Sequence, residues 1–345
     1  MMHIYPVRKT LFPRHVFRIS RASRVQVDNL FLAVEQDGVI GYGEASPNSF
    51  FREDPFDVYM ALAGLTDYFR KQTLRSSDDI ARIWGEIWEK VAPSRATQCA
   101  IDVGLWDLFA KLSRRTVVDA VHGKPARHIP TSATLGICPR EEWPERIAEV
   151  AAFPAIKVKM DARVDLDLIK SVRAGSKAAI RVDANCSWSG IDIERVSSQL
   201  AGLGVEFIEQ PLPREEDNRM PDLLRRSRLP ILADESCTGP EEVPGLVGRF
   251  TGFNIKLVKC GGITPGLRMV EAGKRLGLKT MIGCMLESGL LISAGAVVAQ
   301  EADYADLDGS WLLGEDPFEG LSILDGRLQP PSGLGLGVSP KIVYN

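Results

Sequence analysis

The chain lacks the features that mark membrane proteins, disulfide-stapled scaffolds and nucleic-acid-binding proteins. No apolar run reaches the about 18 residues of a membrane-spanning helix, and the start, MMHIYPVRKT, has no apolar signal-peptide core. The six cysteines are widely spaced, form no CxxC pair and are too few for a scaffold. A net charge of −3 favours neither nucleic acid nor an anionic membrane. We therefore expect a cytoplasmic protein with reduced cysteines and with no nucleic-acid or membrane partner.

The composition that remains is that of a large globular protein. Apolar residues make up 45% of the 345 residues and charged residues 25%, which excludes a disordered chain, a coiled coil and a collagen. The length predicts roughly two domains. A protein of this size and composition is most often an enzyme.

The N-terminal third reads as an α+β unit of strands followed by helices. Residues 24–34 and 39–44 are apolar or alternating segments around a Gln-Asp-Gly turn, which predicts an antiparallel hairpin. Residues 79–91 place their apolar side chains on one helical face. Residues 99–112 form a similar but more apolar segment, which we expect to be a buried helix.

From about residue 130 the chain alternates short apolar strands with helical segments. One such segment, residues 191–203, has an apolar face and Ser189 as its predicted N-cap. This repeat predicts an α/β fold with a (β/α) barrel. A doubly wound open sheet is less favoured because no GxGxxG turn follows any strand. The predicted strands end at residues 137, 159, 183, 209, 234, 256, 283 and 308.

Three of these strand ends carry carboxylates that suit a metal ion. Asp183, Glu209 and Asp234 end successive strands, and the C-terminal strand ends form the active face of such a barrel. Neighbouring strands lie about 4.8 Å apart, so the three carboxylates converge. Oxygen ligands favour Mg²⁺. The alternative is that each carboxylate merely forms a salt bridge at its strand end.

Lysines flank this cluster along the sequence. Lys159 lies one strand before the carboxylates and Lys256 one strand after them, so a closed barrel places two amines on opposite sides of whatever the metal holds. Positive charge from Lys157 and the metal disfavours a protonated lysine, which could then act as a base. Two facing bases suit proton transfer at the carbon between them. A surface amine is the commoner role of a single lysine, but a Lys-Val-Lys pair inside an apolar strand argues against it.

At this point the motifs resemble the enolase superfamily, in its muconate-lactonizing subgroup. The resemblance covers nearly the whole chain. It implies a modified (β/α)7β TIM-like barrel with an N-terminal α+β capping domain, and Mg²⁺ on Asp183, Glu209 and Asp234. It also implies that Lys159 and Lys256 transfer the proton through an enediolate, and that Lys157 binds the substrate carboxylate. The motifs are KVKM (157–160), RVDAN (181–185), IEQPL (208–212), LADES (232–236), NIKLVKCGGI (254–263) and GCMLES (283–288), with GYGEASP (41–47) and AIDVGLWDL (100–108) resembling the capping domain.

The resemblance also predicts the domain limits. Residues 1–122 would form the capping domain and residues 123–315 the catalytic barrel. Residues 316–345 would return to the capping domain. Members of this family are commonly oligomers, so we expect a homo-oligomer that acts on a small molecule.

The last predicted strand distinguishes between the reactions of the subgroup. ADLDGSWLL (305–313) resembles the Asp-x-Asp motif of dipeptide epimerases, in which both aspartates hold the free α-ammonium group of the substrate. Two inward carboxylates, Asp306 and Asp308, are costly without such a cation. The alternative is that one of them caps the turn at Gly309 and the other is solvated. The family also implies substrate contacts for Thr134, Cys284, Met285 and Leu286.

The predicted reaction is Mg²⁺-dependent epimerisation of a dipeptide at the α-carbon of its C-terminal residue. An o-succinylbenzoate synthase or an N-acylamino acid racemase is the alternative within the subgroup. A Schiff-base aldolase that uses Lys159 or Lys256 as its nucleophile is a more remote one, and a catalytically inactive barrel is a third.

The side chains of the dipeptide are left open by the sequence. L-Ala-D/L-Glu epimerases place an arginine of a capping-domain loop on the glutamate side chain, and our alignment puts Ala22 at that position. Four arginines lie nearby, and any of them could contact the substrate: Arg14, Arg18, Arg21 and Arg24.

Overall fold

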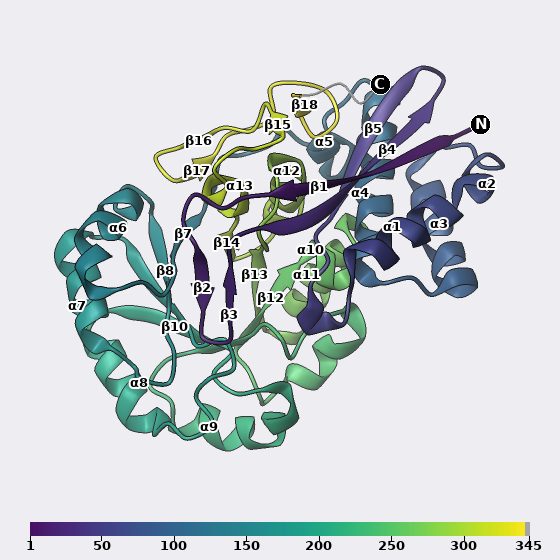
Figure 1. Cartoon of the computed structure of the whole chain (residues 1–345). Coiled ribbons are helices and arrows are strands. Elements are labelled where there is room, and N and C mark those ends of the chain that lie inside the picture. Colours follow the sequence, from purple (N-terminus) through teal and green to yellow (C-terminus); the bar gives the residue numbers. More distant parts are fainter. Residues whose placement is uncertain (342–345) are drawn as a thin grey trace.

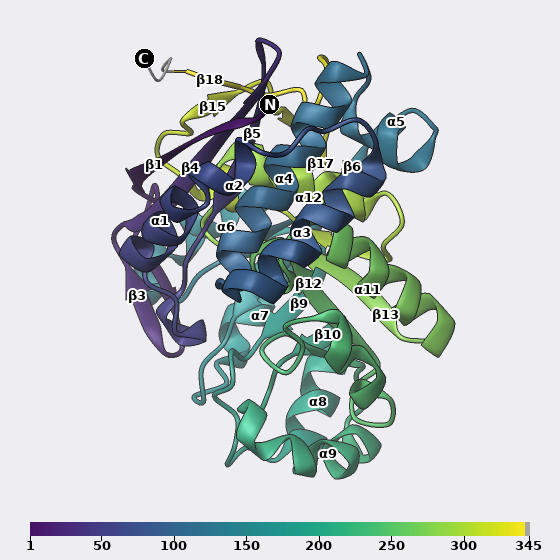
Figure 2. The ribbon, with the colours of Figure 1, turned by 90° about the vertical axis from the view of Figure 1, so that its right-hand side faces the viewer.

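The structure is a computed structural model that describes residues 1–341. It consists of an antiparallel sheet with helices packed on it, built from the N-terminal residues, and a parallel barrel (Figure 1). Figure 2 shows the helices of residues 55–112 (α1 to α4) grouped toward one end of the molecule, with α8 (Ile193–Gly202) and α9 (Met220–Arg226) of the barrel at the other. Among residues 1–341 we find no helix with the length and apolar character that crossing a membrane requires.

The N-terminal sheet has the order β1-β4-β5. The predicted hairpin is confirmed, because β4 and β5 pair and the loop residues Asp37 and Gly38 both have positive φ, as a type I′ turn requires. Strand β1, which pairs with β4, was not predicted. The sheet strands are β1 (His3–Leu11), β4 (Val27–Gln36) and β5 (Val39–Ala45), and the short strands β2 (Phe17–Ile19) and β3 (Ala22–Arg24) form a separate hairpin.

Five helices follow this sheet. The long helix α4 is almost entirely buried, as its composition predicted. It lies so close to β5 that a Cβ on Gly43 would be 1.9 Å from the carbonyl oxygen of Ala100, which explains the glycine there. The helices are α1 (Pro55–Gly64), α2 (Thr66–Phe69), α3 (Ser77–Val91), α4 (Arg95–Leu112) and α5 (Val117–His122).

Eight parallel strands in sequential order form the barrel, which confirms the predicted fold. The first and last strands meet through side chains. The backbone N–H of Leu307 donates to Thr131 Oγ1 at 2.7 Å, and the Ser132 hydroxyl donates to Asp306. The strands are β7 (Ser132–Leu135), β8 (Ala155–Lys159), β9 (Ala179–Asp183), β10 (Val205–Glu209), β11 (Ile231–Ala233), β12 (Gly252–Lys256), β13 (Lys279–Gly283) and β14 (Tyr304–Asp306).

Helical segments connect these strands and form the outer layer of the barrel (Figure 1). The connection after β11 is a 3-10 helix, Pro240–Leu246, with a proline inside it. The α-helices are α6 (Trp143–Val150), α7 (Leu166–Gly175), α8 (Ile193–Gly202), α9 (Met220–Arg226), α10 (Leu257–Cys260), α11 (Ile263–Leu276), α12 (Gly289–Ala299) and α13 (Gly309–Leu312).

Several predicted boundaries are wrong. The first barrel strand ends at Leu135 rather than at residue 137, and the last ends at Asp306 rather than at residue 308. The N-cap of α8 is Asp192, whose side chain accepts from the N–H of Arg195, whereas the Ser189 hydroxyl donates to Glu216. Both residue types cap helices well, so the sequence pattern alone does not choose between them.

The C-terminal segment contacts both parts of the molecule. Strand β17 (Arg327–Leu328) pairs with β16 (Ile323–Leu324) and with β6 (Ile129–Pro130) at the start of the barrel. The ring of Phe318, in β15 (Phe318–Glu319), lies 5.5 Å from that of Phe31 on β4. The domain limits at residues 122 and 315 stay a prediction, and residues 342–345 of the last predicted segment lie outside the described residues.

Candidate active site

Three buried carboxylates converge at the C-terminal ends of the barrel strands. Asp183 and Glu209 are the last residues of β9 and β10, and Asp234 directly follows β11. One oxygen of each lies within 4.8 Å of one oxygen of the other two. Burial raises the pKa of Glu209 to about 7 against the opposing charge of Lys157. An all-oxygen donor set concentrated in a buried space fits a hard divalent cation such as Mg²⁺.

Each carboxylate contacts one of the predicted lysines. Lys159 Nζ lies 2.6 Å from Asp183 Oδ2, and Lys256 Nζ lies 2.9 Å from Asp234 Oδ2. Lys157 Nζ lies 3.1 Å from Glu209 Oε2 and also forms an ion pair with Asp306. All three lysines are buried. The structure thus brings the predicted ligands and lysines into one cluster.

As expected, the charge of Lys157 lowers the pKa of Lys256, but the carboxylates of the protein act in the opposite direction, and the effect of a bound metal stays a prediction. Burial is the largest single effect and also lowers the pKa of Lys256, but the charges of Asp234, Glu209 and Glu235 together outweigh it, and the net shift is upward. The pKa of Lys157 is likewise raised well above its ordinary value, since Asp306, Glu209 and Asp183 outweigh its burial. The spacing of the motifs identified the lysines but not how closely the carboxylates surround them.

The two aspartates of the last predicted strand lie in the same cluster, where Asp306 pairs with Lys157. Asp306 ends β14, whereas Asp308 lies beyond the strand, so only the first of the two has a strand position. Asp308 Oδ2 instead accepts from the backbone N–H of Thr134 at 2.6 Å. Its side chain makes no capping bond to α13, which argues against the turn-capping alternative. Burial and the charge of Asp306 raise the pKa of Asp308 to about 6.

A central pocket of about 520 Å³ joins these groups. It lies between the barrel mouth and the capping residues of the β2–β3 hairpin and the 46–55 segment. Cys284 Sγ lies 3.2 Å from the carbonyl oxygen of Asp306, so this cysteine belongs to the pocket wall. The predicted site residues that line the pocket are Thr134, Lys157, Lys159, Asp234, Lys256, Cys284, Met285, Leu286, Asp306 and Asp308; Asp183 and Glu209 contact it through the lysines.

The capping hairpin contributes an ion pair that the sequence analysis did not predict. Arg21 donates to Glu235 Oε1 at 2.5 Å and to the carbonyl oxygen of Asn185 at 3.0 Å, and its guanidinium lies 4.3 Å from the centre of the Phe50 ring. Glu235 directly follows the metal-ligand candidate Asp234 in the LADES motif. This position is the one feature of the sequence that could have indicated a role for Glu235 in the site. Among the described residues its second oxygen, Oε2, has no hydrogen-bond partner.

The other three arginines have different surroundings. Arg24 lines the central pocket and donates to the Ser49 hydroxyl at 3.3 Å. Arg14 and Arg18 line a neighbouring cavity instead. The structure therefore separates the four arginines that the sequence left equivalent.

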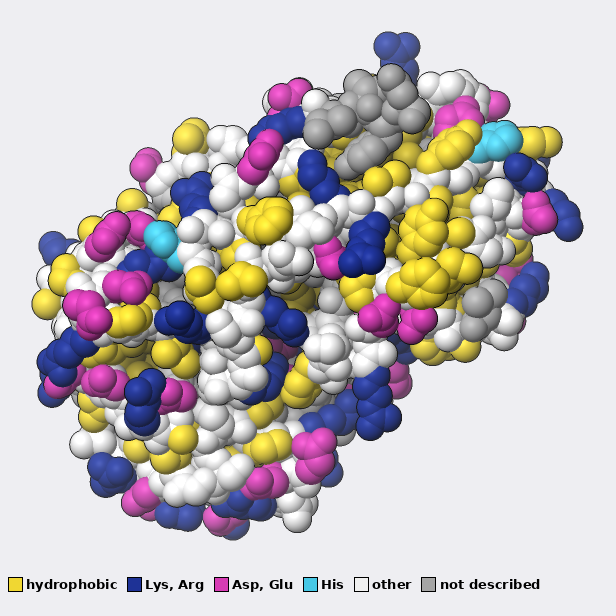
Figure 3. Space-filling view, in the orientation of Figure 1, with side chains coloured by type: hydrophobic (Ala, Val, Ile, Leu, Met, Phe, Trp, Pro, Cys, Tyr) yellow, Lys and Arg dark blue, Asp and Glu magenta, His cyan; other side chains and the backbone are white. Residues whose placement is uncertain are grey.

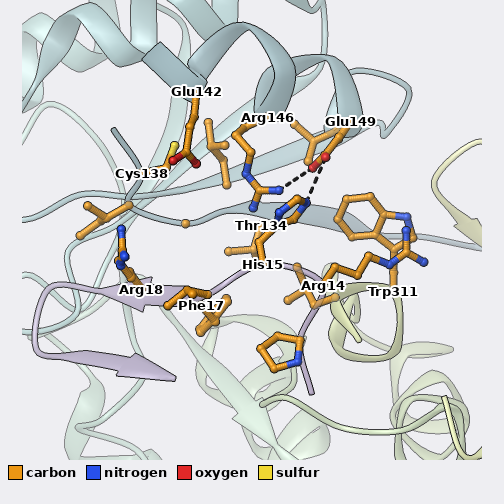
Figure 4. A pocket seen from close by; sticks show the side chains of 17 residues that line it. Arg14, His15, Phe17, Arg18, Thr134, Cys138, Glu142, Arg146, Glu149 and Trp311 are labelled. Carbon is orange, nitrogen blue, oxygen red and sulfur yellow. Dashed lines mark hydrogen bonds and ion pairs between the residues drawn. The ribbon is translucent and has the colours of Figure 1, made fainter. Parts of the chain in front are cut away.

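That neighbouring cavity lies between the N-terminal segment, helix α6 and Trp311 (Figure 4). It also has a volume of about 520 Å³ and shares Phe17, Thr134 and Leu312 with the central pocket. Glu149 accepts from Arg146 at 2.7 Å and from His15 at 3.0 Å, as the dashed lines in Figure 4 mark. Charges of both signs therefore line this cavity and partly neutralise one another.

A barrel with three carboxylates at its strand ends and paired lysines beside them defines a metal-dependent acid–base enzyme. Residues 141–342 match the family model described as Enolase C-terminal domain-like. The chain belongs to this family.

Relatives cover nearly the whole chain. An L-Ala-D/L-amino acid epimerase of Flavobacterium johnsoniae is 34% identical over 94% of this chain and 96% of its own length. A hydrophobic dipeptide epimerase of Roseobacter litoralis is 34% identical over 94% of this chain and 95% of its own length. Among solved structures, a dipeptide epimerase from Methylococcus capsulatus, complexed with Mg and the dipeptide L-Arg-D-Lys, has a TM-score of 0.90 and 31% identity. That match covers 98% of this chain and 99% of the other.

Proposed function

We propose that the protein is a Mg²⁺-dependent dipeptide epimerase, an isomerase that inverts the α-carbon of the C-terminal residue. One observation carries this proposal: two lysines flank a buried carboxylate cluster, and two more buried carboxylates, Asp306 and Asp308, line the same pocket. The lysines beside the carboxylate cluster suit proton transfer at an acidic carbon. The two further carboxylates suit binding of a cationic group at a fixed distance from that carbon. A dipeptide with a free amino terminus has both features.

In this mechanism each group of the chain has one task. Asp183, Glu209 and Asp234 would hold Mg²⁺, which supplies positive charge to the substrate carboxylate as negative charge develops on it. Lys157 binds that same carboxylate, and Asp306 and Asp308 bind the α-ammonium group. Lys159 takes the α-proton from one epimer and Lys256 from the other, and the opposite lysine returns a proton.

The capping hairpin contacts the barrel beside the pocket, which in this mechanism limits the access of water to the reacting carbon. The Ser20 hydroxyl donates to the carbonyl oxygen of Asn185 at 3.0 Å, beside the contacts of Arg21. Figure 1 shows the β2–β3 hairpin lying across the barrel mouth. In a site sheltered in this way, charge interactions with the reacting carbon are stronger than in water.

The alternatives account for fewer of these groups. An N-acylamino acid or a succinylbenzoate precursor has no ammonium group. Asp306 would keep its ion pair with Lys157, but Asp308, which forms no ion pair among the described residues, would be left without a cation. A Schiff-base aldolase would leave the three-carboxylate cluster without a role. Borohydride trapping of a lysine–substrate adduct would support the aldolase.

Activity should depend on both the dipeptide and the metal. Incubation with Mg²⁺ and a panel of L-Ala-L-Xaa dipeptides should produce the L,D epimers, measured by chiral chromatography after hydrolysis. Treatment with EDTA should abolish the reaction and added Mg²⁺ should restore it, because Asp183, Glu209 and Asp234 act in this mechanism only as ligands of the metal. Turnover of N-acylamino acids in place of dipeptides would instead support the racemase.

We propose that Arg24 selects an acidic side chain on the C-terminal residue. Arg21 is neutralised by Glu235. Arg24 lines the same pocket and, among the described residues, donates to the Ser49 hydroxyl and forms no ion pair. Arg24→Gln should lower kcat/KM for L-Ala-L-Glu by about tenfold or more, the order expected for losing one charged hydrogen bond, and leave L-Ala-L-Gln unaffected. Arg18→Gln is the matched control, since Arg18 lines the other cavity. Equal losses on both dipeptides would contradict this role.

Location and assembly stay predictions. On the face shown in Figure 3, basic and acidic side chains are interspersed, in keeping with the net charge of −3. We propose a cytoplasmic homo-oligomer without a nucleic-acid partner. Sedimentation of the purified protein, with and without added DNA, checks the last two points.

A further inference from the structure

The three carboxylates of the cluster use their two oxygens in the same way. One oxygen of each faces a lysine of the pocket: Asp183 Oδ2 faces Lys159, Glu209 Oε2 faces Lys157 and Asp234 Oδ2 faces Lys256. Asp183 Oδ2 also accepts from the side-chain amide of Asn185, a pocket residue, at 3.1 Å. The other oxygen of each carboxylate accepts from a group other than these three lysines, which is its outer contact. These outer contacts are Asn185 N to Asp183 Oδ1 at 2.8 Å, Asn254 Nδ2 to Glu209 Oε1 at 2.7 Å, and Lys259 Nζ to Asp234 Oδ1 at 2.5 Å.

Asn254 is held so that its amide stays on Glu209. It lies on β12 two residues before Lys256, so both side chains point into the barrel. The side chain is fully buried. A Cβ on Gly283 of the neighbouring strand would lie 2.4 Å from Asn254 Oδ1, so the amide packs directly against that glycine. Because Gly283 on β13 has no side chain, the Asn254 amide fits against it, and this contact fixes the position of the amide.

Lys259 holds Asp234 in a comparable way. It is buried, and its Nζ also lies 2.6 Å from the carbonyl oxygen of Asp234 and 3.0 Å from those of Cys237 and Asn254. This ammonium therefore ties the end of β11 to β12, which carries both Asn254 and Lys256. Its acceptors leave it no free donor for a substrate, because an ammonium group has three N–H bonds.

We infer that Asn254 and Lys259 are positioning residues that orient two of the metal ligands. By occupying Glu209 Oε1 and Asp234 Oδ1, they keep Glu209 Oε2 and Asp234 Oδ2 on the side of the lysines Lys157 and Lys256, within the cluster of three carboxylates. A carboxylate released from its outer contact is free to rotate and would meet the ion in fewer of its conformations. Partners of this kind change metal affinity by about 10–100-fold when they are lost. The inference rests on the metal site of the proposed function but not on the dipeptide reaction.

The test is the affinity of the purified full-length protein for Mg²⁺, measured by titration calorimetry without any substrate. Asn254→Leu keeps the branched shape of the side chain, with two methyl groups in place of the amide oxygen and nitrogen, but removes the donor to Glu209, and we expect it to weaken Mg²⁺ binding about 10–100-fold. Asn254→Ser, whose hydroxyl is too short to reach Glu209, should show the same loss if the leucine variant fails to fold. An unchanged dissociation constant in either folded variant would overturn the inference.

Thr280→Val is the matched control for general destabilisation. Thr280 is buried on β13 next to β12, but its hydroxyl donates to Asp303, away from the cluster. This variant should lower the melting temperature and leave the Mg²⁺ affinity unchanged. If Thr280→Val weakened Mg²⁺ as much as Asn254→Leu, the effect would be one of stability and not of positioning. Absence of Mg²⁺ binding to the unaltered protein would refute the metal site itself, whereas failure of the dipeptide panel alone would leave this inference standing.

Discussion

Replacing either Lys159 or Lys256 by alanine is expected to abolish the interconversion of dipeptide epimers. Each lysine would be the proton donor or acceptor on one face of the α-carbon, so either loss stops the full reaction. General acid–base groups contribute about 10²–10⁴-fold each, and we expect a loss of about 10³-fold or more. The measurement is the rate of L,D-dipeptide formation from the L,L epimer under Mg²⁺ saturation.

The two variants should differ in a complementary way in D₂O. A protein that retains one lysine can still exchange the α-proton of the epimer that presents its proton to that lysine. Lys159→Ala should therefore exchange one epimer and Lys256→Ala the other. Lys279→Ala is the control. Lys279 is the first residue of β13, whereas the active site lies at the C-terminal ends of the barrel strands, and it forms an exposed ion pair with Asp303. Near-native turnover of both epimers by either active-site variant would show that the two-base scheme is wrong.

Loss of the aspartate pair should have the next largest effect. Asp306→Asn or Asp308→Asn is expected to lower kcat/KM for dipeptides by about 10²-fold or more, because removing one partner of a buried ion pair costs about 3–5 kcal/mol. The readout is the kinetics of L-Ala-L-Xaa epimerisation by each variant. Unchanged kinetics would mean that the substrate has no ammonium group at this position and would favour the N-acylamino acid racemase.

The same pair predicts a pH dependence. Asp308, with a pKa near 6, must be ionised to bind an ammonium group. As the pH falls through about 6 the free protein protonates this group, so KM for the dipeptide should rise on the acid side. Asp308→Asn should flatten that rise. If the KM of the unaltered protein did not change between pH 5 and 7, a range that includes the pKa of Asp308, the role of Asp308 in binding the ammonium group would be contradicted.

The sequence was sufficient to predict the barrel and the central residues of the site because both follow from local pattern. Strands that recur at regular intervals place their last residues at one face, and Asp183, Glu209 and Lys256 are indeed the final residues of their strands. The identities of these residues, carboxylates beside amines, then indicate the chemistry. Nothing beyond strand periodicity and side-chain type is needed for that part.

Features that depend on tertiary contacts were not predictable in this way. Arg21 reaches Glu235 across 214 residues of sequence, and no local pattern distinguishes it from the other three arginines of its segment. Asn254 lies inside a buried strand, where its role becomes visible only through the amide's distance to Glu209. The upward pKa shift of Lys256 likewise depends on how near Asp234 comes, which motif spacing does not give.

The most direct test of the account is the position at which deuterium enters a dipeptide in D₂O. The protein would be incubated with Mg²⁺ and an L-Ala-L-Xaa dipeptide that it turns over, and each α-proton would be followed by NMR. The two-base mechanism predicts deuterium at the α-carbon of the C-terminal residue in both epimers and none at the first residue. Exchange at the first residue, or no exchange in a protein shown by calorimetry to bind Mg²⁺, would contradict it.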